Sequence, residues 1–198
     1  MKRATLAVLL IVIAAGSAAA QVQLGLRTGR QSIFDSTVRD VYGNGWIFVP
    51  YVRITSKRTQ LAVEFSYEGG YNQSAPIGIY DEMSTLKLYG LEVSAYGWYR
   101  FGIVVPYLKM GIGYYFYNQE IDSEFVDKKV QGSDQQLLFA AGLDIDLPKG
   151  FYLTGEVKVV PWVVAPYGIE VELGGLRYMF GIGYGFDLNF KKSVKDIE

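Results

Sequence analysis

Apolar and polar positions alternate over residues 176–190, near the C-terminal end of the chain. From Leu176 to Phe190 every second residue is apolar or aromatic, whereas the residues between them are mostly glycine, polar or charged. A repeat of two is the period of a β-strand, because successive side chains of a strand point to opposite faces. One face of this predicted strand therefore suits a lipid bilayer, and the other suits a polar interior.

The same alternation recurs earlier in the chain and predicts seven further strands. In chain order these segments are residues 21–28, 45–55, 59–71, 85–100, 105–117, 135–147 and 151–160. Pro50 lies inside the second strand and predicts a bulge there, since proline cannot donate a ladder hydrogen bond.

The predicted connections alternate between long and short. Long connections fall at residues 29–44, 72–82, 118–134 and 161–168, and short ones at residues 56–58, 101–104 and 148–150. Strands joined in this way form an up-and-down meander whose two termini lie at the end with the short turns. The predicted fold is therefore all-β, an eight-stranded antiparallel up-and-down transmembrane β-barrel, in which closure pairs every strand edge as a bilayer requires.

Charged residues collect on one face of the predicted strands, and the other face is almost free of charge. Five basic and five acidic residues share the charged face: Arg27, Arg53, Glu64, Glu92, Lys109, Asp144, Glu156, Lys158, Arg177 and Asp187. An Arg or Lys that faces lipid at the bilayer centre costs roughly 2–4 kcal/mol. We therefore expect these residues to face the lumen and to plug it with ion pairs. A water-soluble lipocalin-like barrel, the architectural alternative, would need an apolar interior and a polar exterior.

Aromatic residues on the apolar face fall near the predicted strand ends. In membrane β-barrels the strand ends lie at the two lipid–water interfaces, where aromatic rings form girdles. The girdle candidates are Tyr67, Tyr89, Tyr99, Phe101, Phe116, Phe151, Tyr178 and Phe190. The alternative is that tyrosine is simply common in strands.

The first twenty residues have the pattern of a cleaved signal peptide. Lys2 and Arg3 precede an apolar run at residues 6–15, and three alanines at residues 18–20 offer a cleavage site. A retained membrane anchor is the alternative, although the run is short for a membrane span. We expect residues 1–20 to be removed, residues 21–190 to form the barrel and residues 191–198 to form a short periplasmic tail.

Composition excludes several classes of function. The chain has no Cys and no His, which argues against disulfides, thiolate sites, Ser-His hydrolysis and most zinc or haem sites. The net charge of −1 gives no reason to expect nucleic acid binding. We expect neither a cofactor nor a bound metal.

Two stretches carry a resemblance to a known family. The segment from Pro106 to Tyr114 and the C-terminal GFDLNF of residues 185–190 resemble small OmpA/OmpX-type outer-membrane barrels of Gram-negative bacteria. The resemblance implies a cell outer membrane location, contact with outer-membrane lipid and lipopolysaccharide, and insertion by the outer-membrane assembly machinery. The family's terminal assembly signal usually ends the protein, whereas residues 191–198 follow it here.

A structural or surface-interaction role through the extracellular loops is the functional hypothesis that we favour. Trp162 and Tyr167, in an apolar loop, are the candidate contacts with an extracellular partner whose identity the sequence leaves unknown. The alternative is that this loop simply extends the two flanking strands beyond the membrane. A narrow porin-like channel is the alternative. A lipid-modifying enzyme ranks third, because the related enzymes are expected to use a histidine; we therefore expect no enzymatic activity.

Overall fold

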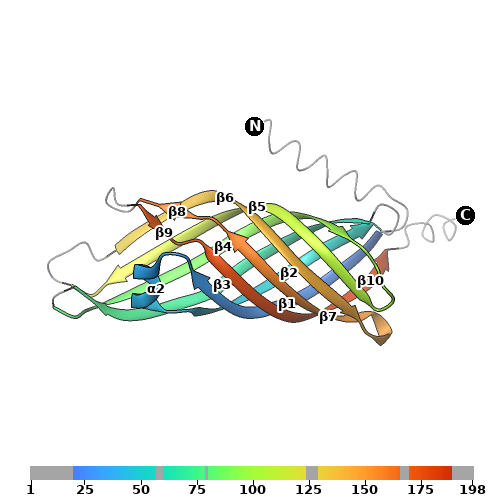
Figure 1. Cartoon of the computed structure of the whole chain (residues 1–198), viewed down its shortest axis with the longest axis horizontal. Helices are drawn as coiled ribbons and strands as arrows, with labels where there is room; N and C mark the ends of the chain where they lie inside the picture. Colours follow the sequence, from blue (N-terminus) through green and yellow to red (C-terminus); the bar gives the residue numbers. More distant parts are fainter. Residues whose placement is uncertain (1–19, 57–59, 79, 124–128, 166–169, 189–198) are drawn as a thin grey trace, which may run out of the picture.

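The computed structural model describes residues 20–56, 60–78, 80–123, 129–165 and 170–188. Eight antiparallel strands close into one barrel in the order β1-β10-β7-β6-β5-β4-β3-β2 (Figure 1), which confirms the predicted fold class. The barrel strands are β1 Ala20–Ile33, β2 Gly45–Ser56, β3 Leu61–Ile77, β4 Glu82–Trp98, β5 Val104–Ile121, β6 Lys129–Asp146, β7 Phe151–Val160 and β10 Gly175–Leu188. Residues 1–19, the tail and Phe190 lie outside the described residues, and cleavage after Ala20 stays a prediction.

The two ends of the barrel differ. At one end, here called the turn end, lie the start of β1, the end of β10 and short connections such as the 3-10 turn η1 (Pro148–Gly150). At the other, the loop end, lie the helix α2 (Ser36–Tyr42) and the small hairpin formed by β8 (Val163–Val164) and β9 (Val171–Glu172) (Figure 1). The barrel closes where β1 pairs with β10, from Ala20 opposite Leu188 to Ile33 opposite Gly175.

Two of the predicted long loops are wrong, because the strands continue through them. β3 and β4 fill most of residues 72–82, and β5 and β6 fill most of residues 118–134. Glu120 pairs with Lys129 near the end of the β5–β6 ladder. Both faces of these strand ends carry polar residues, so the apolar–polar alternation fades although backbone pairing continues.

The predicted loop at residues 29–44 is also partly wrong. β1 runs on to Ile33, and α2 follows after a short break. The carboxylate of Asp35 begins the helix by accepting hydrogen bonds from the backbone N–H groups of Thr37 (2.9 Å) and Val38 (3.2 Å). This is an N-cap, which satisfies amide groups that the first helical turn leaves free.

The predicted bulge at Pro50 is wrong as well. Pro50 lies opposite Leu26, and the β1–β2 register runs past it without a shift. The irregularity lies in β3 between Glu68 and Tyr71, where Gly70 has a φ of 97°, a region that favours glycine. The extra residue changes the parity of β3, so that Glu68 and Tyr71 are both buried.

The two faces of the wall have opposite chemistry. Large apolar side chains such as Leu108, Met110 and Phe180 are exposed on the outside, whereas most charged side chains of the strands are buried inside. This is the inside-out distribution that a membrane barrel requires. Among the described residues, no helix is both long and apolar enough to span a membrane.

Candidate functional site: the barrel interior

The middle of the lumen holds a neutral set of six charged side chains, here called the central ion-pair layer. Its members are Arg27, Arg53, Glu64, Lys109, Asp144 and Glu156. Arg27 donates two hydrogen bonds to Glu64, at 2.9 and 2.8 Å, and lies 3.3 Å from Glu156. Lys109 joins the same two carboxylates at 3.2 and 2.6 Å. Arg27, Glu64 and Glu156 are fully buried, so each charge depends on its partners rather than on water.

Arg53 extends this layer toward the turn end. Its guanidinium lies 3.3 Å from Glu64 and 2.5 Å from Asp144, and it also donates to Gln23 at 3.1 Å. The tyrosine hydroxyls of the lumen add neutral partners, since Tyr96 donates to Glu64 and accepts from both arginines. The layer is therefore one connected network drawn from six strands.

A second ion-pair layer lies nearer the loop end and comprises Glu68, Glu92, Lys158 and Arg177. Lys158 lies 2.5 Å from both carboxylates, and the Nε of Arg177 lies 3.0 Å from Glu68. Glu92 accepts a further hydrogen bond from Tyr115 at 2.7 Å. Two cations face two anions, so this layer is neutral too.

The structure brings together nine of the ten charged residues that the sequence predicts for the lumen. Asp187 differs, because it lies at the turn end and is exposed. Glu68 is the functional residue that the sequence prediction missed. It shares the inward parity of Glu64 and is buried against Lys158 and Arg177, so the alternation along β3 was the signal that could have found it.

Tyrosines fill the lumen by packing over glycines of the neighbouring strands. Tyr51 lies opposite Gly25, and Tyr152 lies opposite Gly183. A Cβ atom built on Gly183 would lie 2.2 Å from the ring of Tyr152, so a larger residue there would displace the ring. The inward glycines therefore provide the space that the rings occupy.

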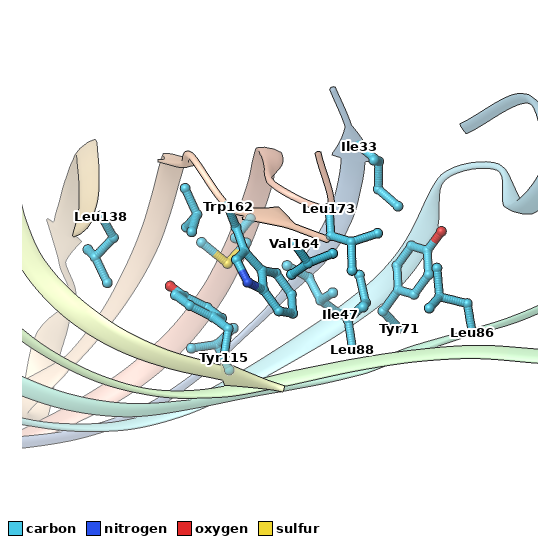
Figure 2. Close-up of a cluster of buried hydrophobic side chains, with 13 residues drawn as sticks. Ile33, Ile47, Tyr71, Leu86, Leu88, Tyr115, Leu138, Trp162, Val164 and Leu173 are labelled. Carbon is cyan, nitrogen blue, oxygen red and sulfur yellow. The ribbon is translucent and has the colours of Figure 1, made fainter. Parts of the chain in front are cut away.

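An apolar cap closes the lumen above the second layer. It is built from Ile33, Ile47, Val49, Tyr71, Leu86, Leu88, Tyr115, Leu138, Val160, Trp162, Val164, Leu173 and Met179. Figure 2 shows the indole of Trp162 among Tyr115, Val164 and Ile47. The ring centroids of Trp162 and Tyr115 are 5.6 Å apart. The cap is thus anchored to the second layer, since Tyr115 belongs to the cap and donates to Glu92.

The predicted exposed contact at Trp162 is wrong, because this side chain is fully buried in the cap. The run of apolar residues after β7 turns back over the lumen, and the backbone hydrogen bond from Gly174 to Trp162 (2.9 Å) holds it there. The other candidate, Tyr167, lies outside the described residues.

The girdle candidates lie toward the two ends of the outer wall. Near the loop end, the rings of Tyr89 and Phe116 are stacked at 4.9 Å. At the turn end, Tyr99 and Phe101 are in contact at 4.7 Å, and Phe151 meets Tyr184. Six candidates have exposed side chains on the described part of the wall, and these are Tyr67, Tyr89, Tyr99, Phe101, Phe151 and Tyr178.

Two cavities flank the packed interior. A polar cavity of about 670 Å³ opens at the turn end, and its wall includes Arg53 and Asp144 of the central layer and the neighbouring Tyr96. A smaller one of about 260 Å³ lies at the loop end between α2 and residues of the apolar cap such as Leu86. Within the described part of the chain, no group of three or more acidic residues is arranged to hold a metal ion.

The closed barrel, its apolar outer belt and its charged interior define the class of this protein, which is an integral outer-membrane β-barrel. The sequence profile of the outer membrane protein beta-barrel domain family matches residues 4–162, and the chain belongs to this family. A comparison with curated protein sequences gives no match.

Solved structures of outer-membrane barrels share the fold. Neisserial surface protein A is 15% identical over 86% of this chain and 98% of its own, with a TM-score of 0.55. Ail of Yersinia pestis is 16% identical over 85% of this chain and 98% of its own, with a TM-score of 0.51. A major outer membrane protein from Thermus thermophilus is 16% identical over 84% of this chain and 99% of its own, with a TM-score of 0.52. These structures show that the chain has the fold of outer-membrane barrels. Its family membership, together with this fold, locates the protein in the outer membrane.

Proposed function

We propose that this protein is a closed, non-conducting scaffold that presents its loop end to an extracellular partner. The observation that carries the proposal is the succession of two neutral ion-pair layers and an apolar cap along the lumen. An eight-stranded barrel is just wide enough for side chains to fill it. In barrels of this class the short turns face the periplasm and the longer loops face outward, so the cap lies on the extracellular side.

The charge of the loop end favours a cationic partner. Among the described residues of this end, acidic side chains outnumber basic ones. The basic residues are Arg30, Arg39, Lys87 and Lys129. The acidic residues are Asp35, Asp40, Asp81, Glu82, Glu120, Asp122, Asp134, Glu170 and Glu172. Complementary charge steers association and suppresses partners of like charge. Ail has been solved in complex with the heparin analogue sucrose octasulfate, a polyanion. The acidic loop end of this chain instead disfavours a polyanionic ligand.

Binding of reconstituted vesicles to charged surfaces tests this part of the proposal. We expect vesicles that carry the protein to bind polylysine-coated beads more than heparin-coated beads. Neutralising the exposed residues Asp40, Asp122 and Glu170 to Asn or Gln lowers the binding, whereas the control pair Lys87→Gln and Lys129→Gln does not. Equal binding by the acid-neutralised variant and the parent protein would contradict a charge-selective loop end.

The outer wall supports lipid and lipopolysaccharide as the surrounding partners. Near the loop end the guanidinium of Arg30 lies 5.4 Å from the ring of Trp46, and both side chains are exposed on the wall. An arginine beside an interfacial ring is suited to a lipid phosphate.

We propose that the outer-membrane assembly machinery inserts this barrel into the membrane. The buried carboxylates are committed to ion pairs, so we propose no enzymatic activity.

A narrow channel is the second candidate function. The polar cavity at the turn end favours it, because this cavity extends from the turn end as far as Arg53 and Asp144. Conduction would further require the second layer and the apolar cap to open together. We rank this function below the closed scaffold because hydrophobic constrictions oppose the passage of ions.

A further inference from the structure

The polar cavity at the turn end is larger than the packing of the barrel requires. Its volume of about 670 Å³ lies within the range of small-molecule sites, roughly 300–1,000 Å³. Residues of seven barrel strands line it, and the central ion-pair layer closes it on the inner side. Its opening faces the periplasm, the opposite side from the surface that the proposed function uses.

The wall of this cavity is electrically balanced and rich in amides. Arg53 pairs with Asp144, and Arg100 pairs with Asp146 at the opening. Three glutamines, Gln21, Gln23 and Gln60, also line the cavity. An amide side chain both donates and accepts hydrogen bonds. The wall therefore suits a neutral ligand with several hydroxyl groups better than it suits an ion.

Three side chains of this wall hold polar atoms whose hydrogen-bonding capacity is unused. Within the described residues, Thr55 Oγ1, Trp98 Nε1 and Asp144 Oδ1 are buried atoms that have no hydrogen-bond partner. Thr55 and Asp144 are themselves 8% and 5% exposed. Buried polar atoms are nearly always paired in folded proteins, so each unpaired one requires an explanation. The three atoms themselves have almost no accessible surface, so a ligand in the cavity would meet the glutamine amides and the aromatic rings rather than these atoms.

Aromatic rings complete the chemistry of the wall. Trp98, Tyr107 and Tyr152 line the cavity beside the glutamines. A flat ring packs against the C–H face of a sugar, while amides and a carboxylate pair with its hydroxyls. We propose that the turn-end cavity is a binding site for an uncharged mono- or disaccharide that enters from the periplasm.

Indole NMR signals of the folded, full-length protein test this site. The chain has three tryptophans, of which Trp98 lines the cavity, whereas Trp46 is on the outer wall and Trp162 is in the cap. Titration of ¹⁵N-labelled protein in nanodiscs with maltose or glucose is expected to shift the Trp98 indole signal saturably. The Trp46 and Trp162 signals should stay in place.

Two cavity variants and one control locate the binding. Gln21→Leu removes one of the three amides of the wall and should weaken binding by about 2- to 10-fold. Gly185→Leu should abolish the shift by filling the cavity, since the three atoms nearest to a Cβ there belong to the flexible Gln21 and Gln23 side chains, at 3.0–3.3 Å. Trp46→Phe should leave the titration unchanged. Heat-modifiable gel migration checks that each variant is folded, and Gln21→Leu alone decides if Gly185→Leu is not.

Three results would overturn the proposal. The first is a Trp98 signal that does not move up to the solubility limit of maltose. The second is a shift that persists at full strength in the folded cavity variants, which would place the binding elsewhere. The third is an equal shift on addition of cyclohexanol, which would indicate an apolar site. None of these results bears on the extracellular scaffold role.

Discussion

At the scale of single residues, the interior is a set of buried charges that depend on one another. Ten charged side chains form the two layers, and each layer balances its own charge. The alternation of the strands predicts that Glu64, Glu92 and Lys158 face the lumen. Every second residue of a strand points inward, and a charged side chain on the other face would meet lipid. It does not predict which carboxylate meets which cation, since the partners come from strands far apart in the sequence.

Removing one cation from the central layer should destabilise the barrel strongly. Arg27→Met leaves the buried Glu64 and Glu156 with only part of their compensating charge, and breaking a buried pair costs about 3–5 kcal/mol. The free energy of unfolding in urea, followed by heat-modifiable gel migration, measures the loss.

Arg100→Met is the matched control for Arg27→Met. The pair of Arg100 with Asp146 is partly exposed at the turn end, and exposed pairs contribute less than about 1 kcal/mol. Equal losses in the two variants would show that the central layer is hydrated and contributes no more than a surface pair.

Adding a side chain at an inward glycine should also destabilise the protein. Gly183→Val drives the ring of Tyr152 out of its place, and overpacking of this kind costs about 1–3 kcal/mol. Gly155→Val is the control, because a Cβ there meets no described atom within 4 Å. Urea unfolding of both variants measures the difference, and a neutral Gly183→Val would contradict the packing of tyrosine over glycine.

At the scale of elements, the apolar–polar alternation predicts the strands well inside the membrane and poorly beyond it. β7 has the bounds that the sequence predicts, residues 151–160. Its inward and outward faces differ in polarity along its whole length, so the alternation marks both of its ends. β5 and β6 continue past the predicted ends, since water or polar groups on both faces remove the contrast without removing the ladder. The change of parity after Gly70 could not be predicted, because the alternation in the sequence does not show where the extra residue of the bulge lies.

The segment after β7 is the element that the sequence prediction misplaces. Its apolar residues predicted an exposed contact, whereas they form part of the cap over the lumen. An apolar run in a connection is compatible with either arrangement. The structure decides between them because Trp162 meets Tyr115 and Tyr117, at 5.6 and 6.1 Å, inside the barrel mouth.

Emptying the centre of the cap should lower stability without opening the barrel. Trp162→Ala removes a fully buried indole, a change that costs about 3–5 kcal/mol in protein cores. Val163→Ala, at the exposed neighbouring position, should cost about 0.5 kcal/mol or less. Urea unfolding compares the two, and a Trp162→Ala variant as stable as Val163→Ala would contradict the role of the cap.

At the scale of the whole molecule, the barrel is a closed wall filled from the middle to the loop end. Closure and inside-out chemistry could be predicted from the sequence, because lipid imposes them on every strand at once. The outer-membrane location is predicted from the family resemblance instead. The stacking of two ion-pair layers beneath an apolar cap could not, since it depends on contacts across the lumen. These contacts are what the account of a non-conducting scaffold rests on.

Single-channel recording of the purified protein in a planar lipid bilayer tests whether the barrel is closed to ions. The closed scaffold predicts no steady conductance above the bare membrane, for the parent protein and for Trp162→Ala, because both ion-pair layers remain in place. Steady, reproducible conductance of the parent protein, lost when the barrel is unfolded, would contradict the account and establish the channel instead.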